Sequence, residues 1–132
     1  MVLNNELFDR LTAQAKASPR LRQNYDLRDS EDDESQRMLN AIEPGTVIPV
    51  HRHTATSEDV IVLRGLAEEV FFDDKGNETS RFLLTPGGET PAIHVPMGQY
   101  HTCRSLESGT IIMEFKNTKY DPETTEDYLH LD

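Results

Sequence analysis

The chain contains no tryptophan, a single cysteine and no long apolar run. Because Cys103 has no second cysteine to pair with, a disulfide within the chain is excluded, which favours a cytoplasmic location. The first residues lack a basic region followed by an apolar one, so we expect no signal peptide. No stretch approaches the roughly 18 to 20 apolar residues that a membrane-spanning helix needs, so we expect no membrane partner.

Positive charge is scarce as well. The sequence has 13 Lys and Arg residues against 24 Asp and Glu residues, which gives a formal net charge of -11. A surface this acidic repels phosphate backbones, so we expect no nucleic-acid partner. An anionic small ligand is still compatible with the sequence, because a local basic site can outweigh the overall field. Residues 29–34 and 121–132 hold much of the negative charge, and we expect both to be solvated.

The length of 132 residues fits one domain that can bury a sizeable core. Residues 4–17 carry apolar side chains at helical spacing and predict one helix. Asn4 or Asn5 can cap its start, and Ser18 followed by Pro19 ends it, because the residue before proline disfavours helical geometry. Residues 20–27 could be extended.

Short alternating segments separated by turn signals dominate the chain from residue 35 onward. We expect strands over residues 36–42, 46–53, 59–63, 67–72, 79–85, 92–96, 101–106 and 110–116. Seven or eight short strands with regular turns predict an all-β sandwich or barrel. The polar tail after residue 117 offers Tyr120, Tyr128 and Leu129 as anchors.

A candidate metal site combines three histidines and a glutamate. His51 and His53 stand two apart, so on a strand they point to the same face, and Glu58 and His101 follow further along the chain. Imidazole and carboxylate ligands suit one divalent transition metal, namely Fe, Zn, Ni, Mn, Co or Cu. The alternatives are unrelated surface or core histidines, and a site of this form that has lost its metal.

The spacing of these residues resembles the conserved motifs of the cupin superfamily. The first motif corresponds to Gly45, His51-x-His53, Glu58 and Gly65, and the core of the second to Pro96-x-Gly98-x-x-His101. Thr90 and Ser105 stand where cupins often have glycine and asparagine, and neither position is a ligand. The resemblance implies a mainly all-β fold, a cupin-type jelly-roll β-barrel with a short N-terminal helix and the metal inside.

A narrower resemblance, to the WbuC-type cupin-fold metalloproteins, covers nearly the whole chain. It is carried by residues 18–24, 36–39, 51–53, 62–65, 72–76, 106–110 and 114–116. Those are small bacterial proteins, some linked to O-antigen or capsule gene clusters, with no established reaction. This chain has Thr118-Lys119-Tyr120 where they usually have Gly-Pro-Tyr, and it lacks their aromatic C-terminal segment and a histidine near Arg28. A site or lid built from the tail would therefore differ.

The resemblance implies one domain in three parts. Residues 1–34 would be a helix and extended segment packing on the barrel, residues 35–117 the barrel, and residues 118–132 an acidic C-terminal tail. The early segments offer Arg22, Asn24, Gln36 and Arg37 as contacts to a polar ligand, with an exposed strand edge as the alternative. Cys103 shares parity with His101 and could face the cavity, or serve as a small buried apolar side chain.

Two classes of function remain open. The first is a metalloenzyme that acts on a small polar molecule, with a carbohydrate of surface-polysaccharide metabolism as one candidate, by isomerisation, epimerisation or dioxygenation. The second is a non-catalytic cupin that binds or senses a small ligand. No second acid–base pair is evident beside the ligands, which weakens a mechanism that moves protons. Open sheet edges in this fold invite pairing, so we expect a homodimer.

Overall fold

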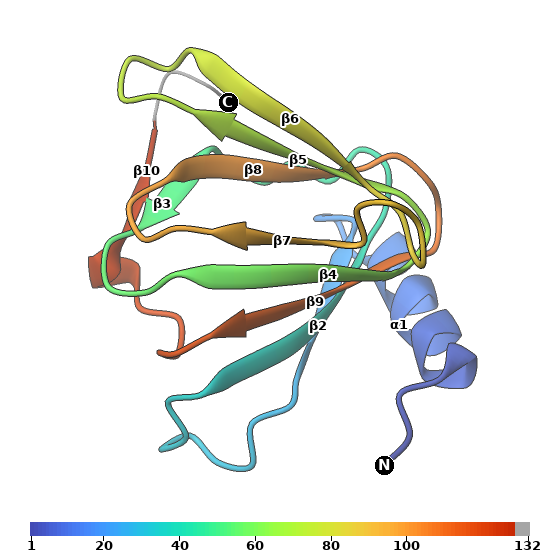
Figure 1. Ribbon diagram of the computed structural model, residues 1–132. Helices are drawn as coiled ribbons and strands as arrows, with labels where there is room; N and C mark the ends of the chain where they lie inside the picture. Colours follow the sequence, from blue (N-terminus) through green and yellow to red (C-terminus); the bar gives the residue numbers. More distant parts are fainter. Residues whose placement is uncertain (129–132) are drawn as a thin grey trace.

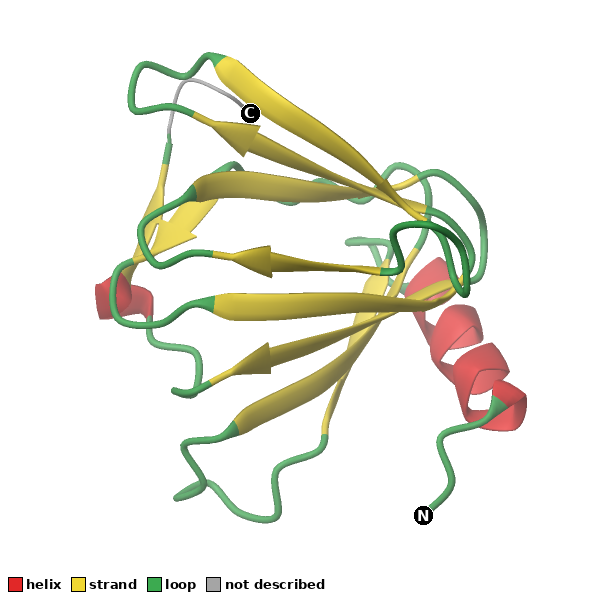
Figure 2. Ribbon diagram, in the orientation of Figure 1, coloured by secondary structure: helices red, strands yellow, loops and turns green. Residues whose placement is uncertain are grey.

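The computed structural model describes residues 1–128, which form two antiparallel five-stranded sheets, one α-helix and one 3-10 turn (Figures 1 and 2). Sheet A has the order β1-β2-β9-β4-β7, and sheet B has the order β10-β3-β8-β5-β6. The elements are α1 (Asn5–Ala17), β1 (Arg22–Asp26), β2 (Gln36–Ile42), β3 (His51–His53), β4 (Glu58–Arg64), β5 (Ala67–Phe72), β6 (Glu78–Leu84), β7 (Ala92–Val95), β8 (Tyr100–Ser105), β9 (Thr110–Lys116), η1 (Pro122–Thr124) and β10 (Thr125–Asp127). The expected all-β jelly roll with a short N-terminal helix is confirmed.

Helix α1 begins and ends where its local signals predict. The side chain of Asn4 accepts a hydrogen bond from the backbone N–H of Leu7 at 3.2 Å, and Ser18 leaves the helix in an extended conformation. The helix packs against β1, β2 and β9, and so covers the outer face of sheet A. No helix in the described part of the chain has the length and apolar character that crossing a membrane requires.

Apolar side chains gather on both faces of sheet A, because successive residues of a strand point to opposite sides. The outer cluster joins the helix to the sheet through Leu7, Phe8, Leu11, Ala15, Leu39, Ala41 and Ile111. The inner cluster lies between the sheets and consists of Ile42, Val60, Val62, Ala67, Leu84, Cys103 and Ile112. The outer cluster thus packs the helix against sheet A, and the inner cluster forms part of the barrel interior.

Gly65 forms the tight connection between β4 and β5. Its φ is +88°, and an added Cβ would lie 2.3 Å from Oγ1 of Thr110. The left-handed backbone and the close approach of β9 therefore both require glycine at this position. The turn brings the chain from sheet A back to sheet B directly after the strand that Glu58 opens.

Two strand expectations near the site need correction. The strand expected over residues 46–53 is reduced to β3, because Thr46 closes a turn onto the carbonyl of Glu43 and Pro49 has no N–H to donate. The polar tail, in turn, contains a strand that the sequence pattern did not predict. Strand β10 pairs with β3 and places Thr125 opposite His53.

The tail is held by hydrogen bonds and by an aromatic contact. The backbone N–H of Tyr128 donates to the carbonyl of Val50 at 2.7 Å, and its ring packs edge-on against Tyr100 with centroids 5.4 Å apart. Tyr120, another expected anchor, is largely exposed and is held through its backbone N–H, which donates to Oε1 of Gln36 at 2.7 Å. Leu129 lies outside the described residues.

Candidate metal centre

The four predicted ligands come from three strands and meet inside the barrel. His51 and His53 lie on β3, and His51 is the direct register partner of His101 on β8. Glu58 opens β4 in the opposite sheet, after the chain has turned through residues 54–57. One ligand atom from each of the four residues lies within 4.8 Å of the others. Strand pairing thus brings together residues that are up to fifty positions apart in the sequence.

Three of the four donor atoms of this cluster are buried and lack hydrogen-bond partners among residues 1–128. Nε2 of His53, Nε2 of His101 and Oε2 of Glu58 have no partner among the described residues. Oε2 of Glu58 lies 3.2 Å from Nε2 of His53 and 3.9 Å from Nε2 of His101. Unpaired buried polar atoms are costly, and a shared cation would satisfy all three. Ligands about 2.0–2.2 Å from one ion lie up to roughly 4.4 Å apart, so a small contraction of the cluster would fit a transition metal.

Two of the histidine rings are oriented by acceptors on their other nitrogen. Nδ1 of His51 donates to the carbonyl oxygen of Pro49 at 2.8 Å, and Nδ1 of His101 donates to Oε1 of Glu69 at 2.6 Å. A ring whose Nδ1 carries the proton has a free lone pair on Nε2. Both rings therefore present Nε2, the nitrogen that can ligate, toward the centre of the cluster.

His53 is oriented by the tail. Oγ1 of Thr125 donates its proton to the carbonyl oxygen of Asp121 at 2.9 Å, and the same oxygen lies 3.3 Å from Nδ1 of His53. Because the hydroxyl proton is already used, Thr125 faces the ring as an acceptor and Nδ1 of His53 donates. Nε2 of His53 is then free for a ligand, as in the other two rings.

The electrostatics of the cluster favour the forms that bind cations. Burial lowers the pKa of His51 to about 4, with a further contribution from His101, and burial also lowers the pKa of His101. Burial alone would raise the pKa of Glu58, but interactions with the rings of His53 and His101 and with the charge of Lys116 hold it to about 2. At neutral pH the rings of His51 and His101 are neutral and the carboxylate is ionised.

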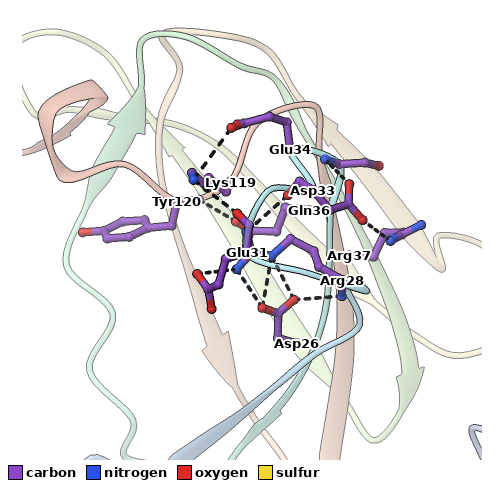
Figure 3. A network of polar contacts seen from close by, with 10 residues as sticks. Asp26, Arg28, Glu31, Asp33, Glu34, Gln36, Arg37, Lys119 and Tyr120 are labelled. Atoms are coloured by element: carbon purple, nitrogen blue, oxygen red, sulfur yellow. Dashed lines mark hydrogen bonds and ion pairs between the residues drawn. The ribbon is translucent and has the colours of Figure 1, made fainter.

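The four side chains line a cavity of about 560 Å³ between the sheets. The predicted ligand contacts Arg22, Asn24, Gln36 and Cys103 also line it. Arg37 does not. It lies between two cavity-lining residues of β2, so it points to the opposite face, where its guanidinium pairs with Asp33 at 2.7 Å (Figure 3). The expectation that Arg37 contacts a ligand in the cavity therefore does not match its position.

Three further charged side chains of the cavity were not predicted as site residues from the sequence. Glu69 on β5 is fully buried, and Glu114 and Lys116 on β9 share the inward parity of Ile112. Burial, followed by the charge of Glu58, raises the pKa of Glu114 to about 8. The sequence did contain a signal for this, because a charged residue on an otherwise apolar strand is unusual at a position that faces the interior. The sequence alone did not show which side of each strand faces the interior, and the pairing of the strands did.

A polar network connects the acidic loop to the tail at the rim of the cavity (Figure 3). Nζ of Lys119 donates to the carbonyl of Glu31 at 3.3 Å and lies 3.8 Å from the carboxylate of Glu34. The neighbouring residue, Tyr120, lines the cavity and is tied to Gln36. Part of the acidic loop expected to be only solvated therefore holds the segment that borders the site.

Solved structures of three proteins are similar to this chain. The capsular polysaccharide assembling protein CapF from Staphylococcus aureus has a TM-score of 0.66 and 20% identity, over 79% of this chain and 29% of CapF. Oxalate decarboxylase from Bacillus subtilis has a TM-score of 0.60 and 19% identity, over 81% of this chain and 27% of the enzyme. Oxalate oxidase in complex with glycolate has a TM-score of 0.62 and 17% identity, over 77% of this chain and 53% of the enzyme. The chain thus spans less than a third of CapF and about half of oxalate oxidase.

All three proteins have the cupin fold, and at these identities the likeness shows the fold alone. No curated protein matches the chain. The profile of the domain of unknown function DUF6016 matches residues 3–84, which reach from the start of the helical region to the end of β6 and include three of the four clustered residues. Because that match covers more than half of the 132 residues, the chain belongs to the DUF6016 family, and its structure is a cupin-type jelly roll.

Proposed function

We propose that this protein is a metalloprotein that binds one divalent transition metal through His51, His53, Glu58 and His101. The observation that carries the proposal is the convergence of buried donor atoms that have no other partner, at the wall of an open cavity. Three imidazoles and one carboxylate suit Fe, Zn, Ni, Mn, Co or Cu. Four protein ligands leave up to two positions of an octahedral ion for a small molecule.

The cavity is arranged for chemistry on a small polar molecule. A bound metal would supply a Lewis acid or an oxygen-binding centre. Glu114 can hold a proton near neutral pH, because its pKa is raised to about 8, and Asn40 and Lys116 add polar groups to the same wall. A carboxyl group with such a pKa suits general acid–base catalysis, which favours isomerisation or epimerisation over dioxygenation. Glu114 thus supplies the proton-carrying group that was not evident in the sequence.

A carbohydrate of surface-polysaccharide metabolism is the substrate class we favour. The resemblance to the WbuC-type proteins supports it, and so does the structural similarity to CapF, which is described as a capsular polysaccharide assembling protein. Both supports are analogies of fold and sequence. A cavity of about 560 Å³ lies within the usual range of small-molecule sites, and its lining mixes amide, carboxyl and ammonium groups with apolar side chains.

The metal content of purified protein tests the proposal. Protein prepared without added metal should contain about one equivalent of a transition metal by elemental analysis, and His53→Ala should lose it, because a ligand is removed. His94→Ala is the matched control, since His94 is exposed, pairs with Asp59 at 2.6 Å and lies outside the cluster. An unchanged metal content in His53→Ala would show that the site assignment is wrong.

The identity of the metal then separates the two classes of function. Iron with oxygen uptake would indicate a dioxygenase, and turnover of a sugar without oxygen would indicate an isomerase or epimerase. Zinc or nickel with no turnover of any sugar would favour the non-catalytic binding or sensing module.

A further inference from the structure

Three positive side chains face the cavity and not an acidic partner. Five arginines have a carboxylate partner within 4.0 Å, namely Arg28, Arg37, Arg52, Arg64 and Arg81. Three positive side chains line the cavity, Arg20, Arg22 and Lys116, and none of them has a carboxylate that close among residues 1–128. Among residues 1–128, Arg10, Lys16, Lys75 and Arg104 also lack a carboxylate that close, but they do not line the cavity, so only the three cavity side chains can meet a ligand there.

Lys116 and Arg22 lie on different strands of sheet A and at different distances from the metal cluster. Lys116 is the register partner of Glu58 on one side and of Gln36 on the other, so it lies in the same row as a proposed metal ligand. Its Nζ lies 6.0 Å from the centroid of the Tyr120 ring at the rim. Arg22 faces the cavity from β1, two strands further along the sheet. Arg22 pairs with Ile42, whose other partner is Thr110, so its row lies about 20 Å along the sheet from the row of Lys116. A small molecule at the metal therefore reaches Lys116, and Arg22 adds positive charge from the other end of the cavity.

With a divalent metal ion bound, the cavity carries a net positive charge. The acidic side chains that line it are Glu58, Glu69, Glu114 and Asp127. A divalent ion together with Arg20, Arg22 and Lys116 exceeds these by one positive charge, even when all four carboxyl groups are ionised. The raised pKa of Glu114 increases the excess at neutral pH. The cavity is thus an electropositive pocket inside an acidic protein, and such a pocket concentrates anions.

We propose that the cavity selects an anionic small molecule, whose carboxylate or phosphate group contacts Lys116 while a neighbouring oxygen atom faces the metal cluster. The inference rests on the proposed function, because the metal supplies part of the positive charge. It narrows the ligand class from polar molecules to acidic ones, such as a sugar acid or a sugar phosphate. A monosaccharide with one anionic group fits within a cavity of about 560 Å³.

Calorimetric titration of metal-loaded protein with three sugars of similar size tests this inference. Glucuronate carries a carboxylate, glucose 6-phosphate carries a phosphate, and glucose is neutral. At least one of the anions should bind at least about tenfold more tightly than glucose, and its affinity should fall as salt is added. The anion with the higher affinity identifies the preferred group. Equal affinity for glucose and both anions, or no binding of either anion, would overturn the inference.

Variants of single positive residues test whether the cavity side chains cause the preference for anions. Lys116→Met should weaken binding of the preferred anion by about tenfold, Arg22→Gln should weaken it by a smaller factor because Arg22 acts from a distance, and both should leave any binding of glucose unchanged. Arg104→Gln removes the same charge from an exposed residue of β8 outside the cavity, so its affinities should equal those of the wild type. A loss in Arg104→Gln equal to that in the cavity variants would overturn the inference, because the overall charge would then explain the binding.

The metal content of each sample is measured before the titration, which separates the two proposals. Metal-loaded protein that shows no preference for anions contradicts the charge selection alone. Protein that takes up no metal contradicts the proposed function. Metal removal from wild-type protein should also weaken binding of the anion, since the cavity then loses two positive charges.

Discussion

At the scale of single residues, the orientation of each imidazole ring in the cluster depends on what its Nδ1 atom contacts. The acceptors are a backbone carbonyl before β3, a buried carboxyl on β5 and a hydroxyl on β10. Each comes from a different segment, and together they direct all three Nε2 atoms to one point. The hydroxyl of Thr125 is the most informative of these partners, because it lies in the tail and its own proton is bound by Asp121.

Replacement of Thr125 by valine should weaken metal binding by about tenfold, because His53 loses the acceptor that holds Nδ1 protonated. Thr125→Ser keeps the hydroxyl and should bind metal nearly as the wild type does. Nitrogen NMR of metal-free protein should show a mixture of His53 tautomers in the valine variant and one tautomer in the serine variant. Unchanged affinity together with an unchanged tautomer in Thr125→Val would rule out this positioning role.

At the scale of elements, helix α1 and the metal cluster lie on opposite sides of sheet A. Leu11 is 1% exposed and packs in the outer cluster. Arg64 adds polar contacts to the helix, with its guanidinium 2.8 Å from the carboxylate of Asp9 and stacked over the ring of Phe8. The helix therefore contributes stability without contacting the cavity.

Leu11→Ala should lower the free energy of unfolding by about 2–5 kcal/mol, because it leaves a cavity in the outer cluster. The metal content of the folded variant should equal that of the wild type. Gln14→Ala, an exposed substitution on the same helix, should change stability by less than about 0.5 kcal/mol. Chemical denaturation and elemental analysis give the two measurements. Loss of metal from folded Leu11→Ala would show that helix and site are coupled.

At the scale of the whole molecule, stability depends on pH through the buried cluster. The ring of His51 has a pKa of about 4 in the folded protein, against about 6.5 in the unfolded chain. Between these two values the unfolded chain binds a proton that the folded chain does not. The free energy of unfolding of metal-free protein should therefore fall as the pH falls from 6.5 to 4.

A comparison with His51→Gln isolates this contribution from the other titrating groups. The stability of metal-free wild type relative to the variant should fall by as much as about 3 kcal/mol between pH 7 and pH 4. Urea denaturation of both proteins in the presence of a chelator measures the difference. A difference that does not change with pH would contradict the lowered pKa of His51.

The features that the sequence predicted best are local or depend on fixed spacing. Helix α1 follows from its apolar period and its cap, and most strands follow from alternation and turn residues. The parity of His51 and His53 on one strand also placed them on one face. Arg37 directly follows Gln36 on the same strand, so the two side chains must point to opposite faces of the sheet. Spacing alone therefore predicts that Arg37 and Gln36 do not both face the cavity, although the resemblance to known proteins grouped them together.

The sequence by itself determined the helix and most of the strands, because periodicity and turn signals are properties of neighbouring residues. The spacing of its motifs predicted that three histidines and a glutamate share the interior, and strand pairing brought them together. Only the tertiary structure decided which groups complete the site. Glu69, Glu114, Lys116 and Thr125 lie on strands whose facing depends on register with partners far along the chain. The sequence likewise could not show that Arg20, Arg22 and Lys116 line the cavity without a carboxylate within 4.0 Å among residues 1–128, because ion pairs form through space and not along the sequence.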